Sequence, residues 1–149
     1  MTDPRSDARL SALYQEVILD HYRRPRNKGP LAAATGSASL RNPLCGDEVD
    51  VHVEMQDGKV ADVRFSGRGC SISQASASMM TELVKGHTAS EVLALGERFA
   101  SMIRGDAGAA ADEVLGQARA LSGVSRFPTR VRCAMIAWEA VARAVSREK

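Results

Sequence analysis

Three cysteines and one aspartate are the residues of this 149-residue chain whose types could together do chemistry. The chain has no fourth cysteine, and each of the three lies in a polar or glycine-containing segment: Cys45-Gly46-Asp47, Gly69-Cys70-Ser71 and Arg132-Cys133-Ala134. Three thiolates and one carboxylate make a complete tetrahedral ligand set. Because folding can gather ligands from distant segments, the sequence predicts one metal site formed by Cys45, Asp47, Cys70 and Cys133.

Two other interpretations of the cysteines stand beside the metal site. Free cysteine is among the most buried residue types, so each could be a small core residue. The three instead lie at the ends of expected elements rather than on apolar stripes, which favours a shared site. A purely structural zinc site usually has cysteines paired two to four residues apart, and this chain has no such pair. Separated ligands with a carboxylate are typical of a weaker, exchangeable site.

Local charge favours the thiolate form of two of these cysteines. Cys70 opens an expected helix, whose positive dipole end stabilises a thiolate. Cys133 is flanked by Arg130 and Arg132, which have the same effect. Because Arg132 is adjacent to Cys133, we expect it to support the site by holding Asp47 or by pairing with an acidic group of a partner.

The three histidines are interpreted differently from the cysteines. His21 and His87 lie at expected helix ends, where a capping role is favoured over metal binding. His52 lies on the polar side of an expected strand, where it would be solvated. None of the three is predicted to be a metal ligand.

Composition and charge exclude several classes of function. The net charge of +2 is too small to indicate nucleic-acid binding. No apolar run approaches the roughly 20 residues of a membrane span, and the polar first residues do not resemble a secretory signal. An odd number of cysteines argues against a disulfide framework and favours a reducing cytoplasm.

The elements that must position these residues are a small sheet followed by helices. An amphipathic helix is expected to end near Arg24, and strands are expected at residues 35–40, 48–56 and 60–65. Ala61, Val63 and Phe65 are expected to point inward, and Asp57-Gly58 predicts a hairpin.

Helical periodicity begins after Gly69 and continues to the last helix, which has the clearest pattern. Thr88 and Glu91 predict a capping box. The segment 105–123 has a weak stripe at Val114, Leu115, Ala118 and Leu121 and is interpreted as a short helix or a mobile insert. The predicted fold class is α+β, with a small antiparallel three-stranded sheet packed by helices in a single domain over residues 1–149.

Long motifs in the chain resemble the IscU/NifU/SufU family. They are Leu13 to Tyr22, Arg24-Pro25-Arg26-Asn27, Asn42-Pro43-Leu44-Cys45-Gly46-Asp47, and the segment from Gly67 to Ser78. The similarity extends over nearly the whole chain and implies a SufE/NifU-like sandwich. Where the IscU branch has a histidine before the third cysteine, this chain has Arg132. It also lacks the Leu-Pro-Pro-Val-Lys segment and has an apparent insert at about 103–123, so it is similar to the SufU branch.

The resemblance implies a function for each predicted ligand. Cys45, Asp47, Cys70 and Cys133 would bind one Zn2+ ion, and Cys45 would accept sulfur. The donor would be the persulfide of a pyridoxal-phosphate cysteine desulfurase of the SufS type, and a downstream cluster-assembly scaffold would follow. This makes the chain a sulfurtransferase, hence an enzyme, in iron–sulfur cluster assembly.

Two alternatives to sulfur transfer remain open on the sequence. The same ligands could hold a transient [2Fe-2S] cluster or iron, because soft thiolates accept either metal. A third interpretation is an interaction module that carries a structural zinc and only activates the desulfurase.

Overall fold

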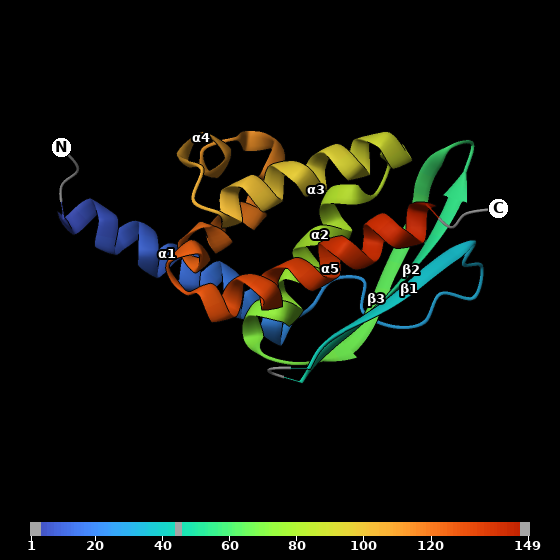
Figure 1. The fold of residues 1–149 in the computed structure, drawn as a ribbon, viewed down its shortest axis with the longest axis horizontal. Coiled ribbons are helices and arrows are strands. Elements are labelled where there is room, and N and C mark those ends of the chain that lie inside the picture. Colours follow the sequence, from blue (N-terminus) through green and yellow to red (C-terminus); the bar gives the residue numbers. More distant parts are fainter. Residues whose placement is uncertain (1–3, 44–45, 147–149) are drawn as a thin grey trace.

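The computed structural model describes residues 4–43 and 46–146, with side chains from residue 14 onward in those ranges. Cys45 lies outside the described residues. The elements follow in the order shown in Figure 1: α1 (Pro4–Arg23), β1 (Gly36–Asn42), β2 (Asp47–Gln56), β3 (Lys59–Arg68), α2 (Ser71–Val84), α3 (Ala89–Ile103), α4 (Ala107–Ala110), the 3-10 helix η1 (Glu113–Arg126) and α5 (Pro128–Ser146).

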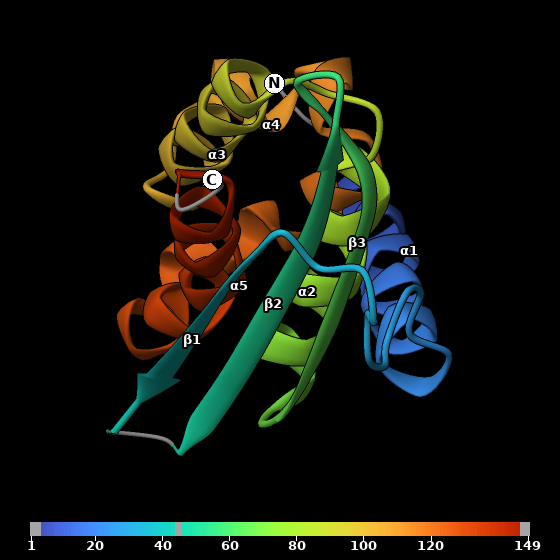
Figure 2. The same ribbon diagram turned by 90° about the vertical axis from the view of Figure 1, so that its right-hand side faces the viewer.

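The three strands form one antiparallel sheet in the order β1-β2-β3. Alternate residues of β2 are buried, because one face of the sheet packs against helices and the other faces solvent. Figure 2 shows the strands in front of α5 and α2, which cover the packed face. The predicted α+β class is therefore confirmed. Asp57 and Gly58 both have positive φ (53° and 77°), as a tight β2–β3 hairpin requires.

The inward face of β3 differs from the prediction by one residue. Val60, Val63 and Phe65 are buried, whereas Ala61 is exposed. A register shift between Glu54 and Met55 pairs Glu54 with Asp62 and Met55 with Val60. Ala61 of β3 is therefore the extra residue of a bulge. A bulge of this kind changes which side chains face the core. The simple alternation of the sequence could not locate it.

The predicted capping box at the start of α3 is confirmed, with the Thr88 side chain accepting from the Glu91 amide. Residues 103–123 include α4 and most of η1, so this segment is ordered and helical. Val114 is exposed, contrary to its predicted place on the stripe. The backbone of η1 is non-helical at Gly116 (φ 49°, ψ −131°), so Val114 does not share a continuous helical face with the later residues. Beyond this break, a three-residue period places Ala118, Leu121 and Val124 on the buried face, and Leu115 before it is buried as well. That the segment is an insert relative to relatives stays a prediction, as does the single domain.

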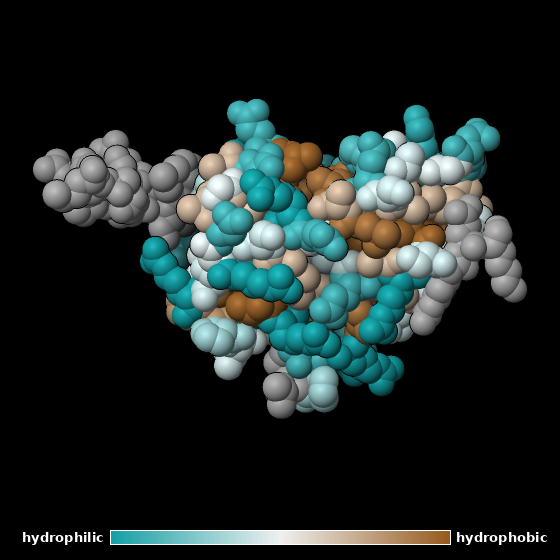
Figure 3. Space-filling view, turned by 45° about the horizontal axis from the view of Figure 1, so that its top comes forward, coloured by the Kyte–Doolittle hydropathy of each residue, from teal (hydrophilic) through white to brown (hydrophobic). Residues whose placement is uncertain are grey.

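The helices are joined to the sheet by a core that is almost entirely aliphatic. Its two stacked aromatic rings, Phe99 of α3 and Trp138 of α5, have centroids 4.8 Å apart. On the face shown in Figure 3, apolar residues form separate patches between hydrophilic ones. Among the helices in the described ranges, none has the length and apolar character needed to cross a bilayer.

His21 is buried and hydrogen-bonded to two other helices, and is not the helix cap that the sequence predicted. Its side chain is 1% exposed because it lies on the inward stripe of α1. Its Nδ1 lies 2.7 Å from Ser78 Oγ of α2, and its Nε2 lies 2.6 Å from Gln117 Oε1 of η1. Ser78 Oγ also accepts a hydrogen bond from the Arg26 amide at 2.8 Å. One imidazole thus ties α1 to two other helices.

We expect His21→Ala to lower the free energy of unfolding by about 2 kcal/mol, because it leaves a cavity at a buried position and removes the hydrogen bonds that join α1 to Ser78 and Gln117. Urea unfolding of the metal-free protein measures this. The control is His52→Ala on the solvent side of the sheet, with an expected change within about 0.5 kcal/mol. Equal effects of the two substitutions would contradict the connecting role of His21.

Candidate metal centre

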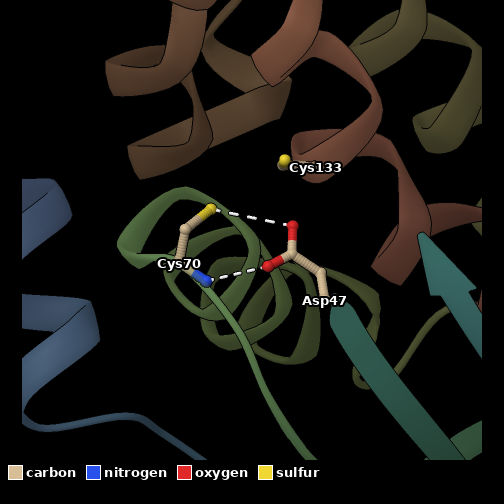
Figure 4. Close-up of side chains that lie close together, drawn as sticks. All are labelled: Asp47, Cys70 and Cys133. Carbon is tan, nitrogen blue, oxygen red and sulfur yellow. Dashed lines mark hydrogen bonds between the residues drawn. The ribbon is translucent and has the colours of Figure 1, made fainter. Parts of the chain in front are cut away.

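Three of the four predicted ligands come together at one end of the sheet. Asp47 begins β2, Cys70 directly precedes α2, and Cys133 lies in the second turn of α5. One potential ligand atom from each lies within 4.8 Å of the other two. Figure 4 shows the two sulfur atoms and the carboxylate pointing toward a common space. Cys45, the fourth predicted ligand, falls outside the described residues.

The Asp47 carboxylate is fixed by the backbone that precedes α2. Its side chain is 1% exposed, and its Oδ1 accepts a hydrogen bond from the Cys70 amide at 2.9 Å. Its Oδ2 lies 3.7 Å from Cys70 Sγ. A Cβ added at Gly69 would lie 2.3 Å from Asp47 Oδ1 and 2.6 Å from Ser73 Oγ. Only glycine therefore leaves room for the carboxylate at this place.

Cys70 is the N-cap residue of α2, and its thiol makes no capping hydrogen bond. The sulfur is half-buried and lies where the positive end of the helix dipole stabilises a negative charge. Its own amide is occupied by Asp47, so the backbone of Cys70 orients one predicted ligand while its side chain supplies another.

Cys133 is fully buried, and its sulfur has polar neighbours on two elements. Its Sγ lies 3.8 Å from the Thr129 carbonyl oxygen, one turn earlier in α5. It also accepts a hydrogen bond from Asn42 Nδ2 at 3.9 Å. Asn42 is the last residue of β1 and is itself 3% exposed. The third ligand is therefore linked to the strand that leads into the segment carrying Cys45.

The guanidinium beside the thiols is that of Arg130. The negative charge of Cys70, together with a hydrogen bond to Cys133 and its charge, raises the pKa of Arg130 above its usual value. Arg132, which the sequence suggested for Asp47, instead forms an ion pair with Glu139 at 3.1 Å. Helical geometry explains the difference. A residue three positions before Cys133 shares its face, whereas the adjacent residue points about 100° away.

The described donor atoms fit a thiolate-binding metal. Zn–S bonds of about 2.3 Å in a tetrahedron place sulfur atoms about 3.8 Å apart. The observed cluster, with all three ligand atoms within 4.8 Å of one another, needs only a small contraction to reach this spacing. Three thiolates and one carboxylate around a divalent ion would leave a net negative charge, which Arg130 offsets. The donor set and its surroundings therefore suit Zn2+ or an iron–sulfur cluster.

Sequence reasoning missed two residues that shape this centre, Asn42 and Gly69. Both lie beside predicted ligands in sequence, but neither has a side chain that binds metal in the usual way. The role of Arg130 was detectable from its i−3 spacing to Cys133. The roles of Asn42 and Gly69 depend on contacts between elements, which spacing along the chain does not encode.

The chain is similar in sequence and structure to known proteins. A family model described as the NifU-like N terminal domain matches residues 13–134. The zinc-dependent sulfurtransferase SufU of Bacillus subtilis (strain 168) is 41% identical over 144 residues, covering 96% of each chain. The iron-sulfur cluster assembly scaffold protein IscU of Streptococcus pyogenes serotype M1 is 41% identical over 140 residues, covering 94% of this chain and 87% of that protein.

A solved structure from Fervidobacterium islandicum AW-1 has the same fold. It is described as an iron-sulfur cluster assembly scaffold protein for the SUF system. Its TM-score is 0.77 at 32% identity, and the match covers 87% of this chain and 94% of that one. The arrangement of strands and helices around the thiol cluster is therefore shared with a solved protein.

We expect Gly69→Ala to lower zinc affinity by about tenfold or more, because the new methyl group displaces the Asp47 carboxylate. Competition with a chromophoric chelator measures the affinity. Gly123→Ala is the matched control, since a Cβ there meets nothing within 4 Å, and its affinity should equal that of the unmodified protein. Unchanged affinity in Gly69→Ala would show that Asp47 does not hold the metal.

Proposed function

The chain belongs to the NifU-like N-terminal domain family, and on this basis we propose that it is a zinc-dependent sulfurtransferase of iron–sulfur cluster assembly. The observation that carries the proposal is the convergence of Asp47, Cys70 and Cys133 within 4.8 Å beside Arg130. The proposed sulfur donor is a pyridoxal-phosphate cysteine desulfurase of the SufS type. A downstream cluster-assembly scaffold would receive the sulfur.

Cys45 is the proposed sulfur acceptor, and the transfer is a thiol–persulfide exchange. The Cys45 thiolate attacks the outer sulfur of the partner's cysteine persulfide. A new S–S bond forms on Cys45, the S–S bond of the partner breaks, and the partner's cysteine leaves as a thiolate. No external oxidant or reductant is needed. Bound zinc would keep the ligand thiols deprotonated and protected from oxidation between turnovers.

The predicted ligands other than Cys45 are held in place by the fold. Asp47 is fixed by the Cys70 amide, and Cys133 is fixed inside α5, so the site keeps its shape when one ligand leaves. Arg130 places a positive charge beside Cys70 and Cys133. The same charge favours the approach of the anionic persulfide to this side of the site.

A groove beside the centre gives the partner a place to dock. It has a volume of about 340 Å³, and apolar side chains of α1 and α2, such as Ile18 and Ile72, line it together with Phe127. Arg126 and Arg130 also line it, and Phe127 is 60% exposed. We infer that a loop of the desulfurase with an apolar side chain next to an acidic one enters here. The apolar side chain would pack on the apolar lining, and the acidic one would pair with an arginine.

We expect Phe127→Ser to raise about tenfold the concentration of this protein that half-maximally stimulates the desulfurase, because exposed aromatics often dominate interface energy. Zinc content should not change. Val114→Ser is the matched control, since Val114 is 49% exposed and does not line the groove. Steady-state desulfurase assays at increasing concentrations of each variant give the half-maximal concentration for both. Equal behaviour of the two variants would exclude the groove as the docking surface.

A scaffold for a transient [2Fe-2S] cluster is the second candidate function. The observation that favours it is the 41% identity to a relative named as an IscU scaffold, which equals the identity to the named sulfurtransferase. Thiolate ligands alone do not separate the two. Arg132 and the ordered segment at 103–123 support sulfur transfer, through their resemblance to the SufU branch.

Metal and acid-labile sulfide in protein purified without added metal separate the two candidates. We expect about one zinc per chain, no sulfide, and desulfurase stimulation that is lost in Cys45→Ala because the acceptor thiol is gone. Iron with matching sulfide would instead support the scaffold. Stimulation that persists in a folded, zinc-containing Cys45→Ala would support an activating module with a structural zinc.

A further inference from the structure

Asn42, the last residue of β1, directs its side chain at the buried thiol of Cys133. Its side chain is 3% exposed, and its Nδ2 donates to Cys133 Sγ at 3.9 Å. The two residues are 91 positions apart, so the contact exists only after β1 and α5 have packed together. A buried amide directed at a buried sulfur is costly to leave unpaired.

The backbone of Asn42 organises the other side of the centre. Its carbonyl oxygen accepts a hydrogen bond from the Gly46 amide at 2.8 Å, and Asn42 pairs directly with Asp47 in the sheet. The connection between β1 and β2 is thereby closed at its base. Asn42 thus contacts the segment that bears Cys45 and Asp47 through its backbone, and Cys133 through its side chain.

The hydrogen bond from the Asn42 side chain gives Cys133 a different environment from that of Cys70. The positive charge of Arg130 does not separate the two thiols. Arg130 acts on both thiols, so its guanidinium cannot rank them. Cys70 is half-buried and its sulfur lies next to the Asp47 carboxylate, whereas Cys133 is fully buried and accepts from an amide. An N–H donor withdraws electron density from a metal-bound sulfur and makes it a weaker nucleophile, as outer partners of metal ligands commonly do.

We propose that Asn42 is a positioning residue that makes Cys133 the retained ligand of the centre, so that exchange is directed to another cysteine. This inference rests on the proposed function, because a sulfur acceptor must leave the metal while the remaining ligands stay. The hydrogen bond lowers the reactivity of Cys133, and burial keeps reagents and partner groups away from it. Exchange is then left to Cys45 or Cys70, and the proposed function assigns it to Cys45.

The test follows the reaction of each cysteine separately in the full-length, zinc-reconstituted protein. Limiting N-ethylmaleimide is added, and the modification of each cysteine is timed by peptide mass spectrometry. In the unmodified protein we expect Cys133 to react last. In Asn42→Asp, which keeps the volume but replaces the amide donor with an acceptor, the ratio of the Cys133 rate to the Cys70 rate should rise about fivefold, as expected for one lost hydrogen bond.

Asn42→Ala and a neighbouring substitution complete the design. Asn42→Ala should raise the same ratio, and it keeps the Gly46 hydrogen bond because that bond uses the backbone of Asn42. Arg41→Ala, whose side chain is exposed on the same strand, should leave the ratio unchanged. If Asn42 only stabilised the structure, its substitution would loosen the whole site, and the modification rates of Cys70 and Cys133 would rise together. An unchanged ratio in both Asn42 variants, or equal acceleration of Cys70 and Cys133, would overturn the proposal.

The labelling experiment needs neither a desulfurase nor a sulfur substrate. Absence of sulfur transfer would overturn the proposed function and leave the Cys133 to Cys70 ratio as a separate result. A second readout is the rate at which a chelator removes zinc, which should rise about tenfold in Asn42→Asp and stay constant in Arg41→Ala.

Discussion

The hydrogen bond from the Cys70 amide to the Asp47 carboxylate is the contact on which the rest of the site depends. It joins the first residue of β2 to the residue that caps α2, and so fixes the sheet to the helical layer at the metal end. Gly69 makes the contact possible by leaving no side chain in the way. α5, packed on β1 and β2, then brings Cys133 to the same place. The centre is a consequence of how β2, α2 and α5 meet.

Much of this arrangement could be predicted from the sequence, because strong local signals agree with the final packing. The alternation of β2, the Asp57-Gly58 hairpin and the capping box at Thr88 each depend on neighbours within a few residues. The convergence of Asp47, Cys70 and Cys133 could be anticipated because each residue lies at or near an element end. Residue type and position within an element thus indicated which side chains could share one centre.

The remaining features depend on contacts between elements that are far apart in sequence. The bulge in β3 exposes Ala61, the break at Gly116 in η1 leaves Val114 off the buried face, and the partners of His21 lie on two other helices. The choice between Arg130 and Arg132 is the exception, because the i−3 spacing of Arg130 to Cys133 in one helix already favours Arg130. In each of the other cases a local pattern allowed two outcomes, and tertiary packing selected one.

The origin of the ligands in three separate elements also sets an order of events during synthesis. A newly made chain contains Asp47 and Cys70 well before it contains Cys133, because all of α3, α4 and η1 lie between them. Until α5 docks, a metal ion would find an incomplete set of ligands and bind weakly. Tight loading therefore coincides with the final packing step, and an ion that binds only the finished fold acts as a lock on assembly. Under the proposed function, metal content would report on whether the protein has folded as well as on whether it can transfer sulfur.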